Sequence, residues 1–237
     1  MKYMGSKARI AKYILPIILK NRQKNQWYVE PFVGGANIID KVDGNRIGVD
    51  NNIYLIEALK LIRDTPNNIP DLITENMYKE SKDYNNKALK GFIGFSMSFG
   101  GKWFGGYRRD IVGTAGCIKN MKTQTRRSKE NALKQSEKLQ GVKLVCCSYN
   151  QIIIPKNSII YCDPPYENTT KYKDKFDHDK FWQWCREKSK EGHKIFISEY
   201  NSPDDFESIW EREITCTLTK DKRSKKSIEK LFIYKSN

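Results

Sequence analysis

The sequence predicts an α/β fold built around a mostly parallel sheet, and three observations lead to this prediction. Residues 27–63 follow the order strand, glycine turn, helix, strand and helix, which is how a parallel sheet with crossover helices begins. The same alternation returns after residue 142. Near the end, two runs of alternating apolar and polar residues flank a polar stretch, which is typical of an antiparallel hairpin. A chain of 237 residues has room for one such domain with a smaller inserted lobe.

The first part of the chain supplies two strands and the helices around them. Residues 8–24 place isoleucines on roughly one helical face, interrupted by Pro16. Residues 27–29 form a short apolar strand, and the glycine turn that follows is expected to open a helix. A second strand, residues 46–50, ends in an acid, and residues 53–63 have the apolar spacing of an amphipathic helix.

The later part of the chain restores this pattern. Four elements are expected in the order strand, strand, helix and strand, at residues 143–147, 158–162, 178–190 and 194–198. The two alternating runs at the end are residues 213–218 and 228–234. Between them, residues 220–226 form a basic connection. Together these runs predict a hairpin that closes the sheet.

The composition favours a polyanionic partner. The formal net charge is +15 and the pI is about 9.4, while a hydrophobic content of 38% is enough for a folded core. Residues 101–143 hold eleven Lys or Arg against three acids. Because each neutralised phosphate releases a counterion, such a basic surface is typical of proteins that bind nucleic acid.

The cysteines and histidines argue against a zinc-binding protein and against an enzyme with a serine or cysteine nucleophile. The six cysteines include no Cys-x-x-Cys pair, and the two histidines complete no zinc spacing, so no metal is expected. Cysteines used in this way indicate a reduced, cytoplasmic protein. No signal peptide is recognised, and the apolar run at residues 14–19 is too short to cross a membrane. Neither histidine lies near a serine or cysteine nucleophile motif.

The tetrapeptide Asp163-Pro164-Pro165-Tyr166 is the clearest candidate for a reacting centre. It follows an apolar run, so it lies where a buried strand ends. Proline has a fixed φ angle and no N–H, which leaves the carbonyls of this turn as acceptors. A carboxylate, an accepting carbonyl and the flat ring of Tyr166 suit a planar base that bears an exocyclic amine. An ordinary proline-rich turn is the alternative.

A glycine turn and an acid form a candidate cofactor site. In Phe32-Val33-Gly34-Gly35, the glycines allow a ligand to approach the backbone. Asp50 ends the next strand, where an acid can bind ribose hydroxyls in Rossmann-like sheets. The Gly-x-Gly-x-x-Gly fingerprint is absent, which argues against an NAD-dependent reductase. Near the N-terminus, Lys7 can donate to a carboxylate and Tyr3 can pack beside it.

The middle of the chain mixes glycines, aromatic residues and cations, most densely in residues 99–109. Aromatic rings can stack on bases or wedge between them, while Arg and Lys hold phosphates or read guanine edges. A glycine-rich surface loop with partly buried rings is the alternative. The candidate DNA-binding residues are Lys102, Trp103, Tyr107, Arg108, Arg109, Arg126 and Arg127.

In combination, these segments resemble the Dam-type (D12 class) DNA adenine N6-methyltransferases. The matching pieces are residues 2–7, 28–35, 49–52 and 160–166. The resemblance implies a Rossmann-like S-adenosylmethionine-dependent methyltransferase sheet with an inserted target-recognition lobe. By position, residues 1–64 and 143–237 would form the catalytic domain. Residues 65–142 would form the lobe.

The resemblance also implies roles for individual residues. The S-adenosylmethionine pocket would be lined by Tyr3, Lys7, Phe32, Gly34, Asp50 and Asp163. The catalytic turn of Asp163, Pro164, Pro165 and Tyr166 would hold an adenine that has left the duplex. The middle of the chain does not align with the recognition hairpin of members that read GATC, so the target sequence stays open.

The sequence therefore predicts a site-specific enzyme that methylates the N6 amino group of adenine in double-stranded DNA, without metal or membrane. Two alternatives stay open: an RNA-modifying S-adenosylmethionine-dependent methyltransferase, and a catalytically silent relative that binds DNA. Binding of S-adenosylmethionine would separate the silent relative from an enzyme. A companion restriction endonuclease and the oligomeric state are not predicted by the sequence.

Overall fold

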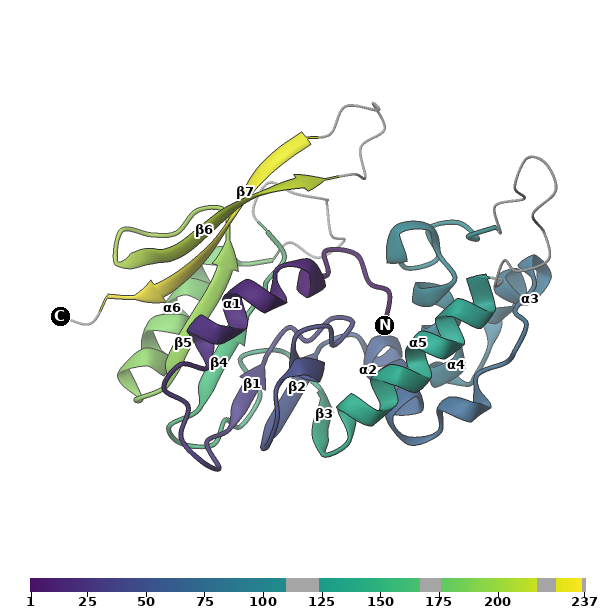
Figure 1. Ribbon diagram of the computed structural model, residues 1–237, viewed down its shortest axis with the longest axis horizontal. Helices are drawn as coiled ribbons and strands as arrows, with labels where there is room; N and C mark the ends of the chain where they lie inside the picture. The colour runs from purple at the N-terminus through teal and green to yellow at the C-terminus, as the bar shows by residue number, and fades with distance from the viewer. Residues whose placement is uncertain (110–123, 167–175, 217–224, 236–237) are drawn as a thin grey trace.

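The computed structural model describes residues 1–109, 124–166, 176–216 and 225–235 (Figure 1). Their centre is a mixed seven-stranded sheet with the strand order β3-β2-β1-β4-β5-β7-β6. The five strands from β3 to β5 are parallel, and β7 runs antiparallel between β5 and β6. The strands are β1 Tyr28–Glu30, β2 Arg46–Asp50, β3 Val142–Cys146, β4 Ile159–Cys162, β5 Lys194–Glu199, β6 Phe206–Cys216 and β7 Lys225–Tyr234. The predicted Rossmann-like α/β sheet is confirmed.

The order of the strands reverses between β1 and β4. From β1 the chain moves outward to β2 and β3, then returns to β4 on the other side of β1, where Val29 pairs with Ile160. Glu30 and the turn after Cys162 therefore lie at neighbouring carboxyl ends of the sheet. Open α/β sheets bind their ligands in the crevice at such a reversal.

Helices cover both faces of the sheet (Figure 1). One apolar core joins the sheet to α1, α2, α4 and α5, and a second core lies under α6 around Phe181 and Cys185. The side chains of Asn52 and Asp177 cap α2 and α6 by accepting backbone N–H bonds of the first turn. The helices are α1 Ala11–Ile18, α2 Ile53–Asp64, α3 Glu75–Glu80, α4 Lys87–Ser96, α5 Gln124–Leu139 and α6 His178–Lys190.

Two local predictions are wrong. The helix expected over residues 8–24 divides into a 3-10 turn, Lys7–Arg9, and α1, which ends two residues after Pro16. The glycine turn opens no α-helix, only a 3-10 turn at Ile39–Lys41. Ala36 has a positive φ of 57°, which an α-helix excludes, and the Gln135 amide of α5 donates to the carbonyls of Gly35 and Ala36 at 3.1 Å each.

The predicted hairpin at the end of the chain is present as β6 and β7, and β6 begins earlier than expected, at Phe206. Residues 217–224, which include most of the basic connection, lie outside the described residues. Since β7 is antiparallel, its early residues reach the carboxyl edge of the parallel strands. Glu199 at the end of β5 is paired with Lys230, so Glu229 lies just beyond it.

Between β2 and β3, helices α2 to α5 form one packed group. The α5 helix reaches back to the sheet, where the Arg46 guanidinium donates to the carbonyls of Lys138 at 2.8 Å and Gln140 at 2.6 Å. The Ser136 hydroxyl donates to the Arg63 carbonyl at the end of α2 at 3.0 Å. The boundaries predicted for the inserted lobe fall at the end of α2 and within β3.

Candidate active site

Asp163 lies directly after β4, at the reversal of the strand order. Its carboxylate Oδ1 is 3.6 Å from the Lys7 ammonium, and about a fifth of the side chain is exposed (21%). Pro164 is buried, whereas Pro165 and Tyr166 are partly exposed. The four residues of the tetrapeptide thus form a compact turn with one carboxylate beside one ammonium.

Burial raises the pKa of Asp163 to about 6, because the Lys7 ammonium offsets only part of the lost hydration. The nearby Glu229 carboxylate contributes to this rise. The side chain is therefore an ionised acceptor at pH 8 and becomes a neutral acid below about pH 6. A poorly solvated carboxylate of this kind is well suited to interact with positive charge that develops beside it.

Lys7 connects the N-terminal segment to the carboxyl edge of the sheet. Its ammonium donates to both oxygens of Glu229, at 3.2 and 3.0 Å, and lies 4.1 Å from the centroid of the Tyr166 ring. Burial lowers the pKa of Lys7, but Asp163 and Glu229 outweigh this and the net pKa is raised. Lys7 is therefore a permanent cation within this group.

Tyr166 points into the same group. Its hydroxyl donates to Glu229 Oε2 at 2.7 Å, and its ring meets Tyr200 edge-on with centroids 4.7 Å apart. Burial, followed by the nearby Asp163 and Glu229 carboxylates, raises the pKa of Tyr166 well above its usual value. The hydroxyl therefore stays a donor. One face of the ring is covered by the Lys7 ammonium.

Asp50 and Gly34 meet on the neighbouring strands. The Asp50 carboxylate accepts the N–H of Asn52 at 3.0 Å and that of Gly34 at 3.4 Å, and it is only partly exposed. Burial raises its pKa to about 6, against the lowering effect of these two N–H donors. The glycine turn and the acid at the end of β2 thus form one unit.

Tyr3 covers the glycine turn from one side. Gly34 has φ +49°, and a Cβ atom there would lie 3.0 Å from the Tyr3 ring. Gly101 has φ +70°, and a Cβ atom on it would lie 2.9 Å from the Tyr3 backbone. The segment before Lys7 is therefore enclosed between the glycine turn and the loop that contains Gly101.

Three of the predicted cofactor residues, Phe32, Lys7 and Asp163, lie apart from this unit. Phe32 packs against Tyr149 and Phe181 in the α6 core, with ring centroids 5.3 and 5.6 Å apart. Lys7 lies with Asp163 and Tyr166 instead. The structure thus assembles Tyr3, Gly34 and Asp50 on one side and Lys7, Asp163 and Tyr166 on the other.

Glu229 and Tyr200 complete the second group, and neither follows from a sequence motif. Glu229 is 3% exposed. The sequence contains one indication of its position. Side chains alternate between the two faces of a strand, so Glu229 shares a face with the apolar Leu231 and an acid occupies a position expected to be buried. Tyr200 follows β5 and contacts Tyr166 only because β5 lies next to β4.

Trp103 and Tyr107 are held within the helical group by specific contacts. The Trp103 ring stacks on Tyr54 with centroids 5.1 Å apart, meets Phe95 at 4.8 Å and is 39% exposed. The Tyr107 hydroxyl donates to the Ile73 carbonyl at 2.6 Å. Phe99, on the same loop, is the more open ring at 63% exposure.

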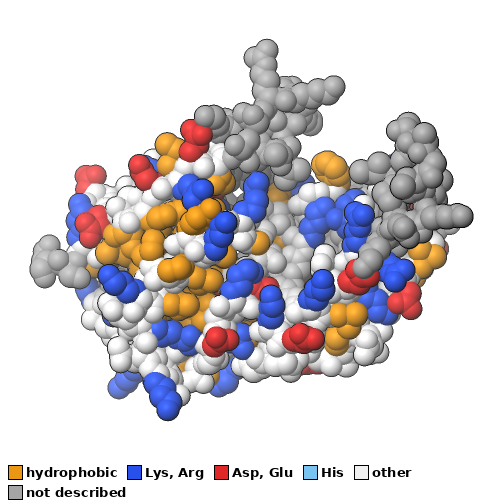
Figure 2. Space-filling view, in the orientation of Figure 1, with side chains coloured by type: hydrophobic (Ala, Val, Ile, Leu, Met, Phe, Trp, Pro, Cys, Tyr) orange, Lys and Arg blue, Asp and Glu red, His pale blue; other side chains and the backbone are white. Residues whose placement is uncertain are grey.

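The candidate cations lie around the N-terminal half of α5 and the loop before it. Arg108 donates to Ser128 at 3.1 Å, and the exposed Arg109 pairs with Glu75 at 2.9 Å. Arg126 is paired with Glu130 one turn later, at 3.4 Å. Lys102 and Arg127 are exposed. Figure 2 shows Lys and Arg side chains spread widely over this side of the molecule.

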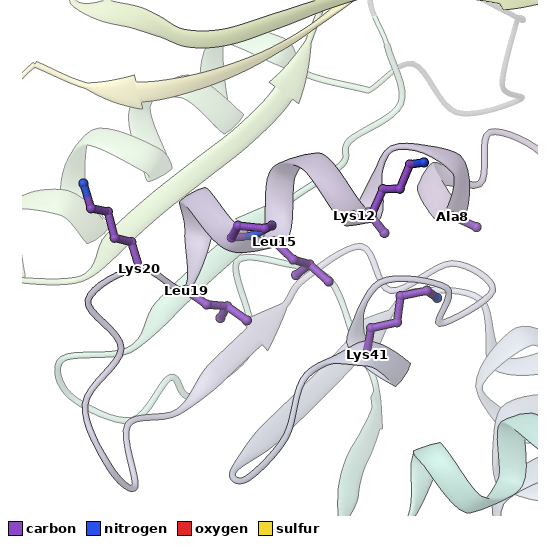
Figure 3. Close-up of a pocket in the computed structure, with 8 residues that line it drawn as sticks. Ala8, Lys12, Leu15, Leu19, Lys20 and Lys41 are labelled. Atoms are coloured by element: carbon purple, nitrogen blue, oxygen red, sulfur yellow. The ribbon is translucent and has the colours of Figure 1, made fainter.

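A separate groove of about 560 Å³ runs along α1 (Figure 3). Apolar side chains such as Leu15 and Leu19 form it, and the lysines Lys12, Lys20 and Lys41 lie at its edge. It contains none of the predicted site residues. Over the described residues, no three His, Cys, Asp or Glu side chains gather as metal ligands would. The same residues contain no helix with the length and apolarity that a bilayer crossing requires.

Comparison with known proteins identifies relatives. The sequence model of the D12 class N6 adenine-specific DNA methyltransferases matches residues 3–94 and 104–225. The Type II methyltransferase M.FokI of Planomicrobium okeanokoites is 23% identical over 210 residues, or 79% of this chain. The chain spans only about a third (32%) of the length of that relative.

Two solved structures are similar over nearly the whole chain. One, from Listeria monocytogenes, is described as a class I S-adenosylmethionine-dependent methyltransferase and has a TM-score of 0.41 and 14% identity. That match covers 99% of this chain and 61% of the other. The second is described as a methyltransferase in complex with SAH and has a TM-score of 0.35 and 12% identity. That match covers 98% of this chain and 54% of the other.

Proposed function

Since the chain belongs to the D12 class N6 adenine-specific DNA methyltransferases, we propose that it transfers a methyl group from S-adenosylmethionine to the N6 amino group of adenine in double-stranded DNA. One observation carries the proposal: the Asp163 carboxylate lies beside Lys7 at the strand reversal, one strand away from the glycine turn. An amine acceptor and a nucleotide-type cofactor site would thus be adjacent.

The residues around the glycine turn fit the cofactor. Asp50 is a partly exposed carboxylate fixed by two backbone N–H groups, which suits the hydroxyls of a ribose. A Cβ atom at Gly34 would press on the Tyr3 ring, so this position of the turn favours glycine. When bound, S-adenosylmethionine supplies an electrophilic methyl group. Tyr3, Gly34 and Asp50 would hold it, with Phe32 supporting the turn from the α6 side.

The tetrapeptide supplies the chemistry on the base. The Asp163 carboxylate and the Pro164 carbonyl accept the two hydrogens of the adenine amine, which turns the nitrogen lone pair toward the cofactor. As the N6 atom becomes positively charged, the ionised Asp163 stabilises it and can take one of its protons. Preorganised groups of this kind contribute on the order of 100-fold or more to rate. Pro165 stiffens the turn, and the Tyr166 ring packs against the base.

The adenine has to leave the duplex to reach this turn, at a cost of a few kcal/mol. Residues 65–142 act as the target-recognition lobe and the rest of the chain as the catalytic domain. The exposed cations Lys102, Arg126 and Arg127 contact phosphates. Arg108 and Arg109 lie on the same side, while Trp103 and Tyr107 shape the loop that carries them. M.FokI, a Type II methyltransferase by name, supports a further proposal that a restriction endonuclease shares the target sequence.

Expression in a host free of DNA methylation tests the proposal. Long-read sequencing of the host DNA should reveal N6-methyladenine at one motif, and the Asp163→Ala variant should abolish it. The purified wild-type protein should also bind S-adenosylmethionine in isothermal titration. Methylated RNA with unmodified DNA would favour the RNA-modifying alternative. Intact DNA binding without cofactor binding would favour the silent relative.

A further inference from the structure

Glu229 is a buried acid in the centre of the candidate site that the proposed mechanism does not use. It lies on β7, on the same face as Leu231, which belongs to the core under α1. The antiparallel direction of β7 brings this early residue to the carboxyl edge of β4 and β5. A carboxylate that is 3% exposed needs strong partners to remain there.

Both partners of Glu229 belong to the reacting group. Oε2 accepts from the Tyr166 hydroxyl at 2.7 Å and from the Lys7 ammonium at 3.0 Å, while Oε1 accepts from Lys7 at 3.2 Å. The same ammonium is 3.6 Å from Asp163. Lys7 is therefore shared between two carboxylates and lies closer to Glu229.

We propose that Glu229 is a positioning residue for the adenine site: it fixes the ring of Tyr166 and holds Lys7 back from Asp163, so that Asp163 remains available to the amine. The inference rests on the proposed function, because it assigns a role within that site. Glu229 itself does not touch the base or the cofactor.

The consequence of removing the negative charge follows from the distances. Without it, the nearest carboxylate for Lys7 is Asp163, and the Lys7–Asp163 contact closes from 3.6 Å to a direct ion pair. Asp163 would then be occupied by Lys7 rather than by the amine. The Tyr166 hydroxyl would also lose its charged acceptor, which loosens the ring.

The acids Glu30 and Glu199 end the neighbouring strands β1 and β5, and each is 3% exposed. Burial raises the pKa of Glu30 well above its usual value. Burial raises the pKa of Tyr161 on β4 well above its usual value, so this phenol stays neutral, and Tyr200 after β5 meets the Tyr166 ring edge-on. Arg212 is the register partner of Glu229 on β6, but its guanidinium lies 3.8 Å from the Tyr13 ring. The electrostatic balance at Asp163 is therefore dominated by Lys7 and Glu229.

Glu229→Gln is the decisive variant, because glutamine keeps the shape and an accepting oxygen but removes the charge. Glu211→Gln, at an exposed position of the neighbouring β6, is the matched control. Methyl transfer to unmethylated DNA is measured from pH 5 to pH 9, together with S-adenosylmethionine binding and thermal unfolding. Glu229→Asp tests rescue, since it restores the charge on a shorter side chain.

We expect Glu229→Gln to lower kcat by roughly 10- to 100-fold at pH 8, with cofactor affinity unchanged. The acidic limb of the kcat profile, set by Asp163, should move to lower pH by roughly half a unit to one unit, because a nearby negative charge is gone and Lys7 is closer. Glu229→Asp should recover part of kcat and return the limb toward its wild-type position. The Glu211→Gln control should match the wild type.

Three outcomes would overturn the inference. One is an unchanged kcat, and another is a lowered kcat with an unmoved acidic limb, which would indicate a purely structural ion pair. The third is failure of Glu229→Asp to recover activity although it folds. If Glu229→Gln does not fold, Tyr166→Phe removes one of the two contacts, and a kcat equal to wild type would then refute the role in fixing the ring. An inactive wild-type protein would instead refute the proposed function.

Discussion

Replacing Asp50 with asparagine is expected to stabilise the protein and to weaken cofactor binding at the same time. The folded protein raises the pKa of Asp50 from 3.8 to about 6, so it holds this proton more tightly than the unfolded chain does. The group therefore stabilises the fold below its unfolded pKa, and this contribution is lost as the pH rises through about 6. At pH 8 the ionised carboxylate is a net cost to folding.

The magnitude follows from the pKa difference. A rise from 3.8 to about 6, at about 1.4 kcal/mol for each pH unit, sets an upper limit of about 3 kcal/mol. Because Asp50 is partly exposed, solvent screens part of this, and asparagine has only one acceptor oxygen for the two backbone N–H groups. We therefore expect a net gain of about 1 kcal/mol in the free energy of unfolding, which corresponds to a rise in Tm of roughly 2–4 °C without cofactor.

The assay pairs two measurements on the purified variant at pH 8. Thermal unfolding without cofactor gives the change in Tm, and isothermal titration gives the Kd for S-adenosylmethionine. Loss of a charged hydrogen-bond acceptor should weaken binding by about 1.5–3 kcal/mol, a roughly 10- to 150-fold rise in Kd. Asp43→Asn, at an exposed position before β2, is the control and should change neither quantity. A fall in Tm together with the loss of binding would refute the reasoning, and so would an unchanged Kd.

Three further predictions concern the reacting carboxylate, the glycine turn and the cations. Wild-type kcat should fall as the pH drops through about 6, since only ionised Asp163 accepts from the amine; a flat profile from pH 5 to 8 would contradict this. Gly34→Ala should lower the free energy of unfolding by about 1 kcal/mol or more, measured by denaturant titration, because φ is +49° and the new Cβ meets Tyr3; an unchanged midpoint would refute the strain. Removing Arg126 or Arg127 should lower the salt-dependence slope of DNA binding by about one each, if each contacts one phosphate; affinity and slope equal to wild type would exclude that contact.

The sheet could be predicted because its strands carry local signals. Short apolar runs bounded by turn residues mark β2, β4 and β5, and the predicted helix at residues 178–190 agrees with α6. The acid at the end of β2 and the tetrapeptide after β4 were each predicted to end a strand, and the parallel order of the strands brings them to one edge. Local pattern and topology point to the same answer in this part of the chain.

The rest depended on contacts between distant segments. Where a helix was expected after the glycine turn, Ala36 has a positive φ of 57°, and Gln135, about a hundred residues later, donates to the carbonyls of Gly35 and Ala36. Trp103 was predicted to contact DNA because of the aromatic and basic composition of its segment, but its ring packs against Tyr54 and Phe95. Composition cannot show which rings a neighbouring helix covers. The DNA-binding roles stay predictions.

Two carboxylates at the carboxyl edge of the sheet make the protein less stable than its fold alone would allow. Asp50 and Asp163 both have a pKa of about 6, so at neutral pH both are ionised where burial disfavours charge. Glu30, at the end of the strand between them, is the contrast: deeper burial raises its pKa well above the usual value, and the Tyr28 hydroxyl donates to it at 2.9 Å. A neutral Glu30 adds no negative charge between the other two. Asp50 and Asp163 thus lie where a ribose and an amine would bring donors, and binding would recover what folding loses there.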